Sequence, residues 1–391
     1  MSLKNKKVIL GVTGSVAAYK SAGLARRLTE AGASVHVIMT DASKNFITPL
    51  SLSIASQNKV YSGLFDDPIS HITLTADADV MVIAPATANI IGKFANGIAD
   101  DFLSTCFLSF RGRVVIAPAM NWRMYENPVF KRNLDSLLSY GIMQIGPDKG
   151  SLACGEEGAG RMAEVQDIID AVISSVTEKD LNGRKILVTA GPTREYIDPV
   201  RFISNRSSGK MGFAIAKAAI RRGAEVILIS GPSDLMPPPK AQFIRAETAS
   251  GMREAVLRHY MDCDAVIMAA AVADFTPADM SSSKVEKSET MVLNLVKTPD
   301  ILAEIGALKK RPFLVGFAAE TGQDTSRARR KLIEKGADFI VFNNVASELS
   351  GFDVDTNEIT IIERDKITPV PLMTKDAVAD VILGRITELI T

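Results

Sequence analysis

The sequence predicts an α/β protein of two doubly wound, three-layer domains of the Rossmann or flavodoxin-like type, each with a mainly parallel sheet. Short apolar runs alternate with amphipathic helical patterns along the 391 residues. Runs of this kind are typical of parallel strands that helices cover on both faces. The chain length suggests two or three domains, at about 100–200 residues each. The second half also opens as the first does, with a strand, a glycine-containing loop and a helix.

Composition limits the class of protein. The 45 basic and 45 acidic residues balance, which argues against a surface for nucleic acid. Cys106, Cys154 and Cys263 are too far apart for a disulfide framework or a Cys-x-x-Cys metal pair, and this favours a reducing compartment. No stretch has the pattern of a signal peptide, and none approaches the roughly 20 apolar residues of a membrane helix. We therefore expect a cytoplasmic protein with neither nucleic-acid nor membrane partners.

In the first half, three strands are each followed by a loop with polar or glycine residues. A buried strand begins at residue 8, and the others lie within residues 77–89 and 111–120. A fourth strand, residues 34–40, follows the first helix. In a doubly wound sheet, ligands bind beyond the carboxyl ends of the strands. A candidate site is therefore expected in the loops that share this edge, residues 11–15, 84–89 and 117–121.

A short polar joint at residues 177–183 separates the halves, and the expected domains are 1–180 and 181–391. After the joint, a strand opens through glycine and serine into a helix at residues 211–221, with Arg221 on the outer face. This arrangement aims backbone N–H groups and the helix dipole at one point, which suits a phosphate or carboxylate. A P-loop is not indicated, because Met211 stands where its serine or threonine belongs.

The rest of the second half alternates between patterned and unpatterned segments. A strand is expected within residues 264–275, and a polar stretch of weak pattern follows from 276 to 292. Long loops of this kind inside compact domains are often functional. Residues 352–371 are typical of an antiparallel hairpin at a sheet edge, and residues 375–390 form the final helix.

The first half resembles the flavin-dependent cysteine decarboxylase family. The motifs that carry the resemblance are GVTGS at 11–15, PATAN at 85–89, PAMN at 118–121 and ACGEEGAGRM at 153–162. His71 matches the family's active-site histidine in position and neighbours. The resemblance implies FMN as the cofactor, held by Gly14, Ser15, Thr40, Pro85, Thr87 and Asn89.

The same resemblance implies the chemistry. FMN would oxidise the thiol carbon of the substrate, which eases loss of CO2, and the reduced flavin would then reduce the enethiol. His71 would act as the base, Asn121 would hold the carboxylate and Cys154 would supply the final proton. The glycine-rich segment around Cys154 is expected to close over the substrate.

Simpler interpretations apply to some of these residues. A lone cysteine is usually a small buried apolar residue, and we expect this of Cys106 and Cys263, which lie in apolar runs. Trp122, beside the PAMN motif, is expected to pack rather than to react.

The second half resembles phosphopantothenate–cysteine ligase. The matching segments are TAGPTRE at 189–195, SNRSSGKMG at 204–212, AAVADF at 270–275, TPDI at 298–301 and GFAAET at 316–321. Together with the first half, in this order, they resemble the bacterial bifunctional coenzyme A biosynthesis flavoproteins. That family uses CTP to convert the carboxylate of 4'-phosphopantothenate to an acyl-cytidylate, which the amine of cysteine then attacks. The decarboxylase next converts 4'-phosphopantothenoylcysteine to 4'-phosphopantetheine.

The resemblance also implies roles for ligase residues. Lys284 would be the catalytic cation, Asn205 would hold the acyl intermediate, and Asp274 would bind Mg²⁺ with substrate phosphates. The choice between Lys284 and Lys287 stays open, and so does the role of Arg206. A homo-oligomer larger than a dimer is implied as well. The expected CTP contacts are Asp274, Lys284, Pro299, Asp300, Ile301, Phe317, Lys331 and Lys335.

Two other functions fit the sequence less well. A nicotinamide-dependent dehydrogenase is disfavoured, because G-x-G-x-x-G is absent from both halves. A non-catalytic flavin-fold regulator would need neither a complete second half nor His71, Asn121 and Cys154 together. No local pattern distinguishes CTP from ATP, so that choice rests on the resemblance.

Overall fold

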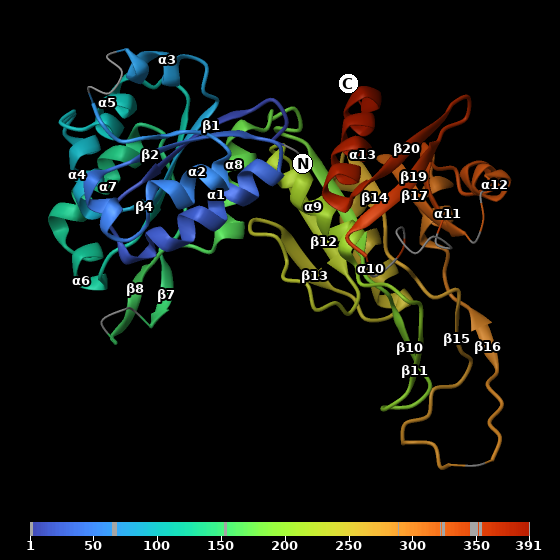
Figure 1. Cartoon of the computed structure of the whole chain (residues 1–391). Helices are drawn as coiled ribbons and strands as arrows, with labels where there is room; N and C mark the ends of the chain where they lie inside the picture. Colours follow the sequence, from blue (N-terminus) through green and yellow to red (C-terminus); the bar gives the residue numbers. More distant parts are fainter. Residues whose placement is uncertain are drawn as a thin grey trace. The chain divides into compact units, whose positions relative to one another are not determined.

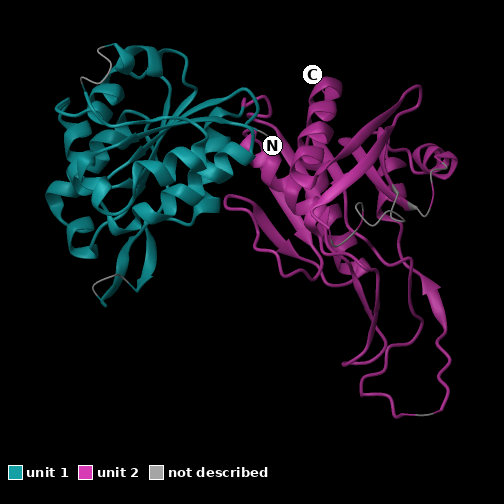
Figure 2. Cartoon of the chain, viewed as in Figure 1, with its two compact units in different colours: residues 1–177 teal, residues 178–391 magenta. Residues whose placement is uncertain are grey.

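The computed structural model describes residues 3–64, 69–151, 155–287, 289–320, 322, 325–344, 351 and 354–390. Its contacts divide the chain into two compact units, Met1–Thr177 and Glu178–Thr391, which Figure 2 shows in separate colours. Within the described ranges, no helix has both the length and the apolar character needed to cross a membrane.

Unit 1 is built on a six-stranded sheet in which every neighbouring pair is parallel. The strand order is β3 (Val60–Tyr61), β2 (Ser34–Met39), β1 (Lys7–Val12), β4 (Val80–Ala86), β5 (Arg113–Pro118) and β6 (Met143–Gln144). The order reverses between β1 and β4, so the carboxyl ends of these two strands border the crevice that such sheets use for ligands.

Helices cover both faces of this sheet (Figure 1). Alternate residues of β1 point to opposite faces: Leu10 packs with the helices of one side and Ile9 with those of the other. The first side has α1 (Lys20–Glu30), α2 (Pro49–Ser56) and α8 (Val165–Val176). The second side has α3 (Ser70–Ala76), α4 (Ala88–Ala95), α5 (Phe102–Ser109) and α7 (Pro128–Ser139). The shorter elements are η1 (Val16–Tyr19), η2 (Asp41–Asn45), α6 (Trp122–Tyr125) and the antiparallel hairpin β7 (Asp148–Ser151) and β8 (Glu157–Arg161).

Unit 2 has an eight-stranded sheet whose first six strands pair in parallel, and its last two pairings, β18 with β19 and β19 with β20, are antiparallel. The order is β13 (Gln242–Arg245), β12 (Glu225–Ser230), β9 (Lys185–Ala190), β14 (Ala265–Met268), β17 (Phe313–Glu320), β18 (Phe339–Asn344), β19 (Thr356–Ile362) and β20 (Ile367–Thr374).

The unit 2 sheet also lies between two layers of helices. One buried cluster contains α9 (Lys210–Arg221) and α13 (Lys375–Ile390), and the other contains α10 (Ala249–His259), α11 (Ile301–Gly306) and α12 (Ser326–Glu334). A short 3₁₀ turn, η3 (Tyr260–Asp262), follows α10. Two antiparallel ribbons extend from this body in Figure 1, and their strands β10 and β15 lie close together. They are β10 (Arg194–Tyr196) with β11 (Phe202–Ser204), and β15 (Phe275–Pro277) with β16 (Leu295–Lys297).

The two doubly wound three-layer units confirm the predicted fold class. The final helix and the antiparallel hairpin are also confirmed. Two details were wrong. The strand predicted within 264–275 ends at Met268, and Arg221 is not on an outer face. Its guanidinium is buried beneath α13, 3.7 Å from Asp376 Oδ2 and 3.8 Å from Asp380 Oδ2.

Candidate active sites of the two units

Hydroxyl groups join the carboxyl ends of β1 and β4 in unit 1. The buried Thr13 hydroxyl donates to the Pro85 carbonyl over 2.7 Å and accepts from the Thr87 N–H at 3.2 Å. The Thr87 hydroxyl then caps α4 by accepting from the Ile90 N–H. The first turn of α4 is thereby fixed at the switch point of the sheet, where its remaining N–H groups can face an anion.

The loops after β1 and β2 lie against each other beside this point. A Cβ at Gly14 would come within 2.5 Å of the Ala42 Cβ, so only glycine fits there. Ser15 caps η1, accepting from the Ala17 N–H at 3.4 Å. The Thr40 hydroxyl is buried and has no hydrogen-bond partner among the described residues. Because an unpaired buried hydroxyl is costly, this atom fits a site that a bound polar group completes.

A cavity of about 410 Å³ lies beside these loops, between η1, α6 and the hairpin. Ser15 and Asn121 both line it. Asn121 also caps α6, since its Oδ1 accepts from the Arg123 N–H at 2.9 Å. Strand β8 packs closely here: a Cβ at Gly160 would lie 2.1 Å from the Met120 carbonyl oxygen. The PAMN loop and the hairpin are thus held together around one space.

Glu156 anchors the hairpin near its turn. Its carboxylate accepts from Trp122 Nε1 at 2.7 Å and from Arg123 Nη2 at 2.6 Å. A Cβ at Gly158 would lie 2.6 Å from the Trp122 Cβ, so the indole packs on the hairpin, as expected. Cys154, the expected proton donor, lies outside the described residues.

The structure does not bring every predicted unit 1 residue to this cavity. His71, on α3, is not part of the cavity lining, and its Nδ1 is buried with no partner within the described part of the chain. Asn89 is exposed on α4. Cys106 and Cys263 are free and buried as expected, and burial raises the pKa of Cys106 to about 12 and that of Cys263 to about 11. Neither thiol is therefore a ready nucleophile.

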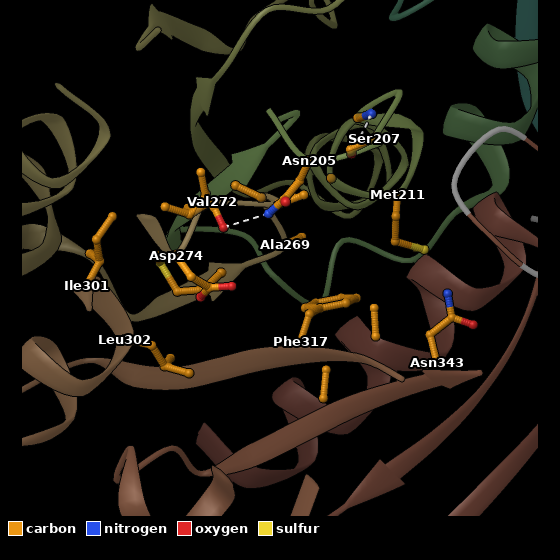
Figure 3. Close-up of a pocket in the computed structure, with 18 of the residues that line it drawn as sticks. Asn205, Ser207, Met211, Ala269, Val272, Asp274, Ile301, Leu302, Phe317 and Asn343 are labelled. Carbon is orange, nitrogen blue, oxygen red and sulfur yellow. Dashed lines mark hydrogen bonds between the residues drawn. The ribbon is translucent and has the colours of Figure 1, made fainter. Parts of the chain in front are cut away.

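Unit 2 has a larger cavity, of about 850 Å³, at the carboxyl ends of its parallel strands. Figure 3 shows the ring of Phe317 between the side chains of Asp274 and Leu302 and those of Met211 and Asn343. The predicted residues that line this cavity are Asn205, Asp274, Pro299, Asp300, Ile301, Phe317, Lys331 and Lys335.

The start of α9 forms one wall of this cavity. Gly209 precedes the helix with a φ of 80°, a conformation that favours glycine. A Cβ at Gly212 would meet the Ala190 Cβ at 2.6 Å and the Thr189 carbonyl oxygen at 2.9 Å. This close approach seats the first turn of α9 against the end of β9, with Lys210 in the cavity wall.

Lys331, on α12, and Lys335, which caps the end of that helix, reach the opposite wall. Lys331 Nζ donates to the Phe317 carbonyl over 2.7 Å, and Lys335 is paired with Asp300. Asp300 also caps α11, accepting from the Ala303 N–H at 3.0 Å. Burial tends to raise the pKa of Asp300, but the Lys335 and Ala303 hydrogen bonds and the charges of Lys335 and Lys331 hold it below its usual range. Asp300 thus stays charged and fixes Lys335 in the cavity wall.

The segment after β14 completes the site. Asn205 Nδ2 donates to the Val272 carbonyl over 2.9 Å, the bond drawn in Figure 3, and Asp274 follows two residues later in the same wall. Within the described ranges, no group of three or more His, Cys, Asp or Glu side chains could hold a metal ion. A Mg²⁺ ion at Asp274 would therefore need oxygen atoms from a substrate.

Neither Lys284 nor Lys287 lines the cavity, and both are exposed. Their loop is bound instead to the turn between β10 and β11. Asp198 Oδ2 accepts from the Val285 N–H at 3.2 Å, and Arg201 Nη2 donates to the Val285 carbonyl at 2.7 Å. Burial tends to raise the pKa of Asp198, but backbone N–H groups and the Arg201 charge hold it below its usual range.

Sequence reasoning missed several residues of the unit 2 cavity. Lys375, at the start of α13, is 6% exposed, and its Nζ donates to the Gly351 carbonyl at 2.8 Å and to the Val354 carbonyl. No motif surrounds it, so no local signal could have found it. Lys210 pairs with Asp355 at 2.7 Å, and here the SSGKMG segment was the available signal.

Comparison with known protein families assigns both units. Residues 1–177 match the Flavoprotein family, and residues 181–390 match the family described as "DNA/pantothenate metabolism flavoprotein C-terminal domain". The Coenzyme A biosynthesis bifunctional protein CoaBC of Bacillus subtilis (strain 168) is 46% identical over 397 residues, covering 99% of this chain and 98% of the relative. Its Escherichia coli (strain K12) counterpart is 44% identical over 396 residues, with the same coverage.

The chain belongs to the CoaBC family. It is therefore a bifunctional enzyme of coenzyme A biosynthesis, a flavoprotein with decarboxylase and ligase activities.

Solved structures resemble the separate units. A C-terminal domain of CoaBC is 44% identical over 54% of this chain and 98% of its own length, with a TM-score of 0.47. A PPC decarboxylase mutant complexed with pantothenoylaminoethenethiol is 37% identical over 43% of this chain and 97% of its own, with a TM-score of 0.41.

Proposed function

We propose that residues 181–391 are a CTP-dependent phosphopantothenate–cysteine ligase and that residues 1–180 are an FMN-dependent phosphopantothenoylcysteine decarboxylase. The ligase product is the decarboxylase substrate, so one chain would carry both steps from 4'-phosphopantothenate to 4'-phosphopantetheine. The family membership supports the pair of activities, and the residues of each cavity support their assignment to the units.

The observation that carries the ligase assignment is the charge of the unit 2 cavity. Among the described residues, six cationic and two acidic side chains line it, which suits a nucleoside triphosphate together with a phosphorylated carboxylate. The cationic ones are Arg206, Lys210, Lys297, Lys331, Lys335 and Lys375. Preorganised positive charge of this kind also stabilises the charge that moves onto the pyrophosphate as it leaves.

Each predicted residue of unit 2 would then have its own role in the ligase reaction. Lys331, on α12, and Lys335, one turn later at the end of that helix, would hold the nucleotide, and Phe317 would pack against it. Asp274 would take Mg²⁺ jointly with the phosphates. Asn205 would hold the acyl intermediate, and the bond from its Nδ2 to the Val272 carbonyl fixes the amide in the cavity wall. Lys284 would act from its anchored loop, which lies apart from this cavity in the structure.

In unit 1, the switch-point loops would hold FMN through Gly14, Ser15, Thr40, Pro85, Thr87 and Asn89. When bound, the flavin supplies reversible oxidation of the substrate's thiol carbon. Asn121 would hold the substrate carboxylate in the cavity that it shares with Ser15. His71 would act as the base and Cys154 as the proton donor. The hairpin anchored by Glu156 would exclude water from that cavity.

The proposal extends to assembly and location. We propose a homo-oligomer larger than a dimer in the cytoplasm, with no nucleic-acid or membrane partner. Large apolar side chains on the α1–α2 side of unit 1 support the assembly, because Tyr19, Leu50 and Ile54 are more than half exposed. Light scattering coupled to gel filtration measures the mass directly, and a monomer would contradict this part of the proposal.

Product analysis tests the two activities separately. Purified enzyme is given 4'-phosphopantothenate, cysteine, Mg²⁺ and either CTP or ATP, and pyrophosphate and CO2 are measured. Ligase activity requires one pyrophosphate for each amide formed, with CTP preferred. Decarboxylase activity requires CO2 from 4'-phosphopantothenoylcysteine without nucleotide, from protein that releases FMN on denaturation. Lys284→Ala and Lys287→Ala then decide which lysine is catalytic, since only the catalytic one should abolish pyrophosphate release.

A further inference from the structure

A buried threonine is hydrogen-bonded to two segments that form the wall of the unit 2 cavity. Thr193, in the TAGPTRE segment, is 0% exposed and does not line the cavity. Its hydroxyl accepts from the Ala273 N–H at 3.0 Å, directly before Asp274 in the chain. Its carbonyl accepts from the Ser204 hydroxyl at 2.7 Å, directly before Asn205. Thr193 is therefore hydrogen-bonded to the residue before Asp274 and to the residue before Asn205.

The neighbouring contacts show why a hydroxyl is needed there. Strand β14 ends at Met268, yet the following residues still run alongside the segment after β9. The Ala270 N–H binds the Thr189 hydroxyl at 3.1 Å, and the Ala271 N–H binds the Gly191 carbonyl at 2.9 Å. Two side-chain hydroxyls thus take the place of ladder carbonyls where the regular strand has ended. The backbone can leave the sheet and form a cavity wall without unpaired buried N–H groups.

The same wall carries a cavity-side contact. Asn205 Nδ2 is bound to the Val272 carbonyl, one residue before the Ala273 N–H that Thr193 holds. Moving Ala273 would therefore move the acceptor that orients the Asn205 amide. Thr193 is thus connected to Asn205 in two ways, through Ser204 and through the Val272–Ala273 peptide group.

We propose that Thr193 is a positioning residue of the ligase reaction, whose buried hydroxyl fixes Asp274 and Asn205 relative to each other, with Thr189 supporting the same wall at Ala270. The proposal rests on the proposed ligase function of unit 2. Thr193 itself touches no substrate. Its hydroxyl acts through the Ala273 N–H.

The test compares Thr193→Val, which keeps the shape and removes the hydroxyl, with Thr193→Ser, which keeps the hydroxyl. We expect Thr193→Val to lower the ligase kcat/KM for CTP about tenfold, mainly through KM, as the loss of one buried hydrogen bond would. Thr193→Ser should stay within about twofold of wild type. CO2 release by unit 1 of the same molecules serves as an internal control and should not change.

A matched control removes another hydroxyl from unit 2. Thr387 accepts from Arg222 at 3.0 Å and donates to the Leu383 carbonyl, but it lies away from the cavity lining. Thr387→Val should leave the ligase kcat/KM for CTP unchanged. If Thr193→Val does not fold, Thr189→Val makes the same measurement at the other end of the wall, with the same expected loss.

The outcomes separate the inference from the function on which it rests. Wild-type enzyme without CTP-dependent pyrophosphate release would refute the ligase function itself. Active wild type with a Val variant inside the twofold range would overturn the role of Thr193. A Ser variant as impaired as the Val variant would also overturn it, because packing of the methyl group would then be the cause. A loss confined to the Val variants, rescued by Ser, supports the proposal.

Discussion

The ammonium nitrogen of Lys331 lies 2.7 Å from the carbonyl oxygen of Phe317, so helix α12 is bound to strand β17 at the wall of the unit 2 cavity. The bond keeps the charge of Lys331 beside the ring that would pack on the nucleotide. Lys335, one turn later, is held in the same wall by Asp300. Both lysines are thus preorganised for an anion, with their side-chain freedom already restricted.

Removing either α12 charge should weaken nucleotide binding. We expect Lys331→Met and Lys335→Met each to raise the ligase KM for CTP about 10- to 100-fold, the range for a lost hydrogen bond to a charged group. Lys366, in the exposed turn between β19 and β20, is a control, and Lys366→Met should leave KM unchanged. Steady-state pyrophosphate release measures all three. Equal KM values for Lys335→Met and Lys366→Met would refute a nucleotide role for Lys335, and the same comparison with Lys331→Met tests Lys331.

Acid should remove the stabilising effect of the Asp300 charge. The pKa of Asp300 lies below its ordinary value of 3.8 in the folded protein, because the Lys335 and Ala303 hydrogen bonds outweigh burial. A carboxyl with a lowered folded pKa stabilises the fold above its unfolded pKa and loses that effect as the pH falls through the folded pKa. Asp300→Asn keeps the helix cap and removes the charge.

The variant should therefore be less stable than wild type at neutral pH, and the difference should shrink as the pH falls below about 4. Circular dichroism during denaturant unfolding measures it. The only tryptophan, Trp122, lies in unit 1, whereas Asp300 lies in unit 2. Tryptophan fluorescence therefore reports the unfolding of unit 1, which should be the same in wild type and Asp300→Asn. A stability difference that grows in acid would contradict a lowered pKa for Asp300.

The sequence predicted features that depend on local pattern and missed those that depend on distant packing. The final helix and the edge hairpin have complete local signals, and both were found. Arg221 has a spacing typical of an outer face, yet α13, more than 150 residues later in the chain, covers it. Strand β14 ends at Met268, and hydroxyls of Thr189 and Thr193 then bind the Ala270 and Ala273 N–H groups, which no pattern within residues 264–275 reveals.

The candidate sites show the same division. Motif residues such as Asn205 and Asp274 were predicted and share one cavity. Lys375 also lines that cavity, but it enters from the start of a helix after a hairpin, with no motif around it. Lys284 was predicted as the catalytic cation and a CTP contact, and in the structure its loop is bound to Asp198 and Arg201. Contacts between segments far apart in the chain, such as these, depend on the fold, and no local sequence pattern reveals them.

Two helical glycines should respond oppositely to alanine. A Cβ at Gly212 would clash with Ala190 at 2.6 Å and push α9 from β9, so Gly212→Ala should destabilise unit 2 by about 1–3 kcal/mol and reduce ligase activity. Gly384, inside α13, has open space at its Cβ, and Gly384→Ala should stabilise by about 0.5–1 kcal/mol. Denaturant unfolding followed by circular dichroism measures both. Two changes of the same sign would show that the packing of α9 on β9 is not the constraint.

Thr40 should matter to the flavin more than to the fold. Its hydroxyl is buried without a partner in the described part of unit 1, so Thr40→Val should leave the FMN-free protein as stable as wild type or about 1 kcal/mol more stable. FMN affinity should fall about tenfold, because the cofactor would lose one hydrogen bond. Trp122 fluorescence during unfolding gives the stability, and flavin titration of the apoprotein gives the affinity.

Thr13 supplies the contrast, since its hydroxyl is already bound to the Pro85 carbonyl and the Thr87 N–H. Thr13→Val should destabilise unit 1 by about 1–3 kcal/mol, because it leaves two buried backbone groups unpaired. Opposite signs for the two threonines in FMN-free protein would mean that the Thr40 hydroxyl is kept for a ligand. A destabilising Thr40→Val with unchanged FMN affinity would mean that this hydroxyl serves the fold, and the cofactor site would then have to lie elsewhere on the sheet edge.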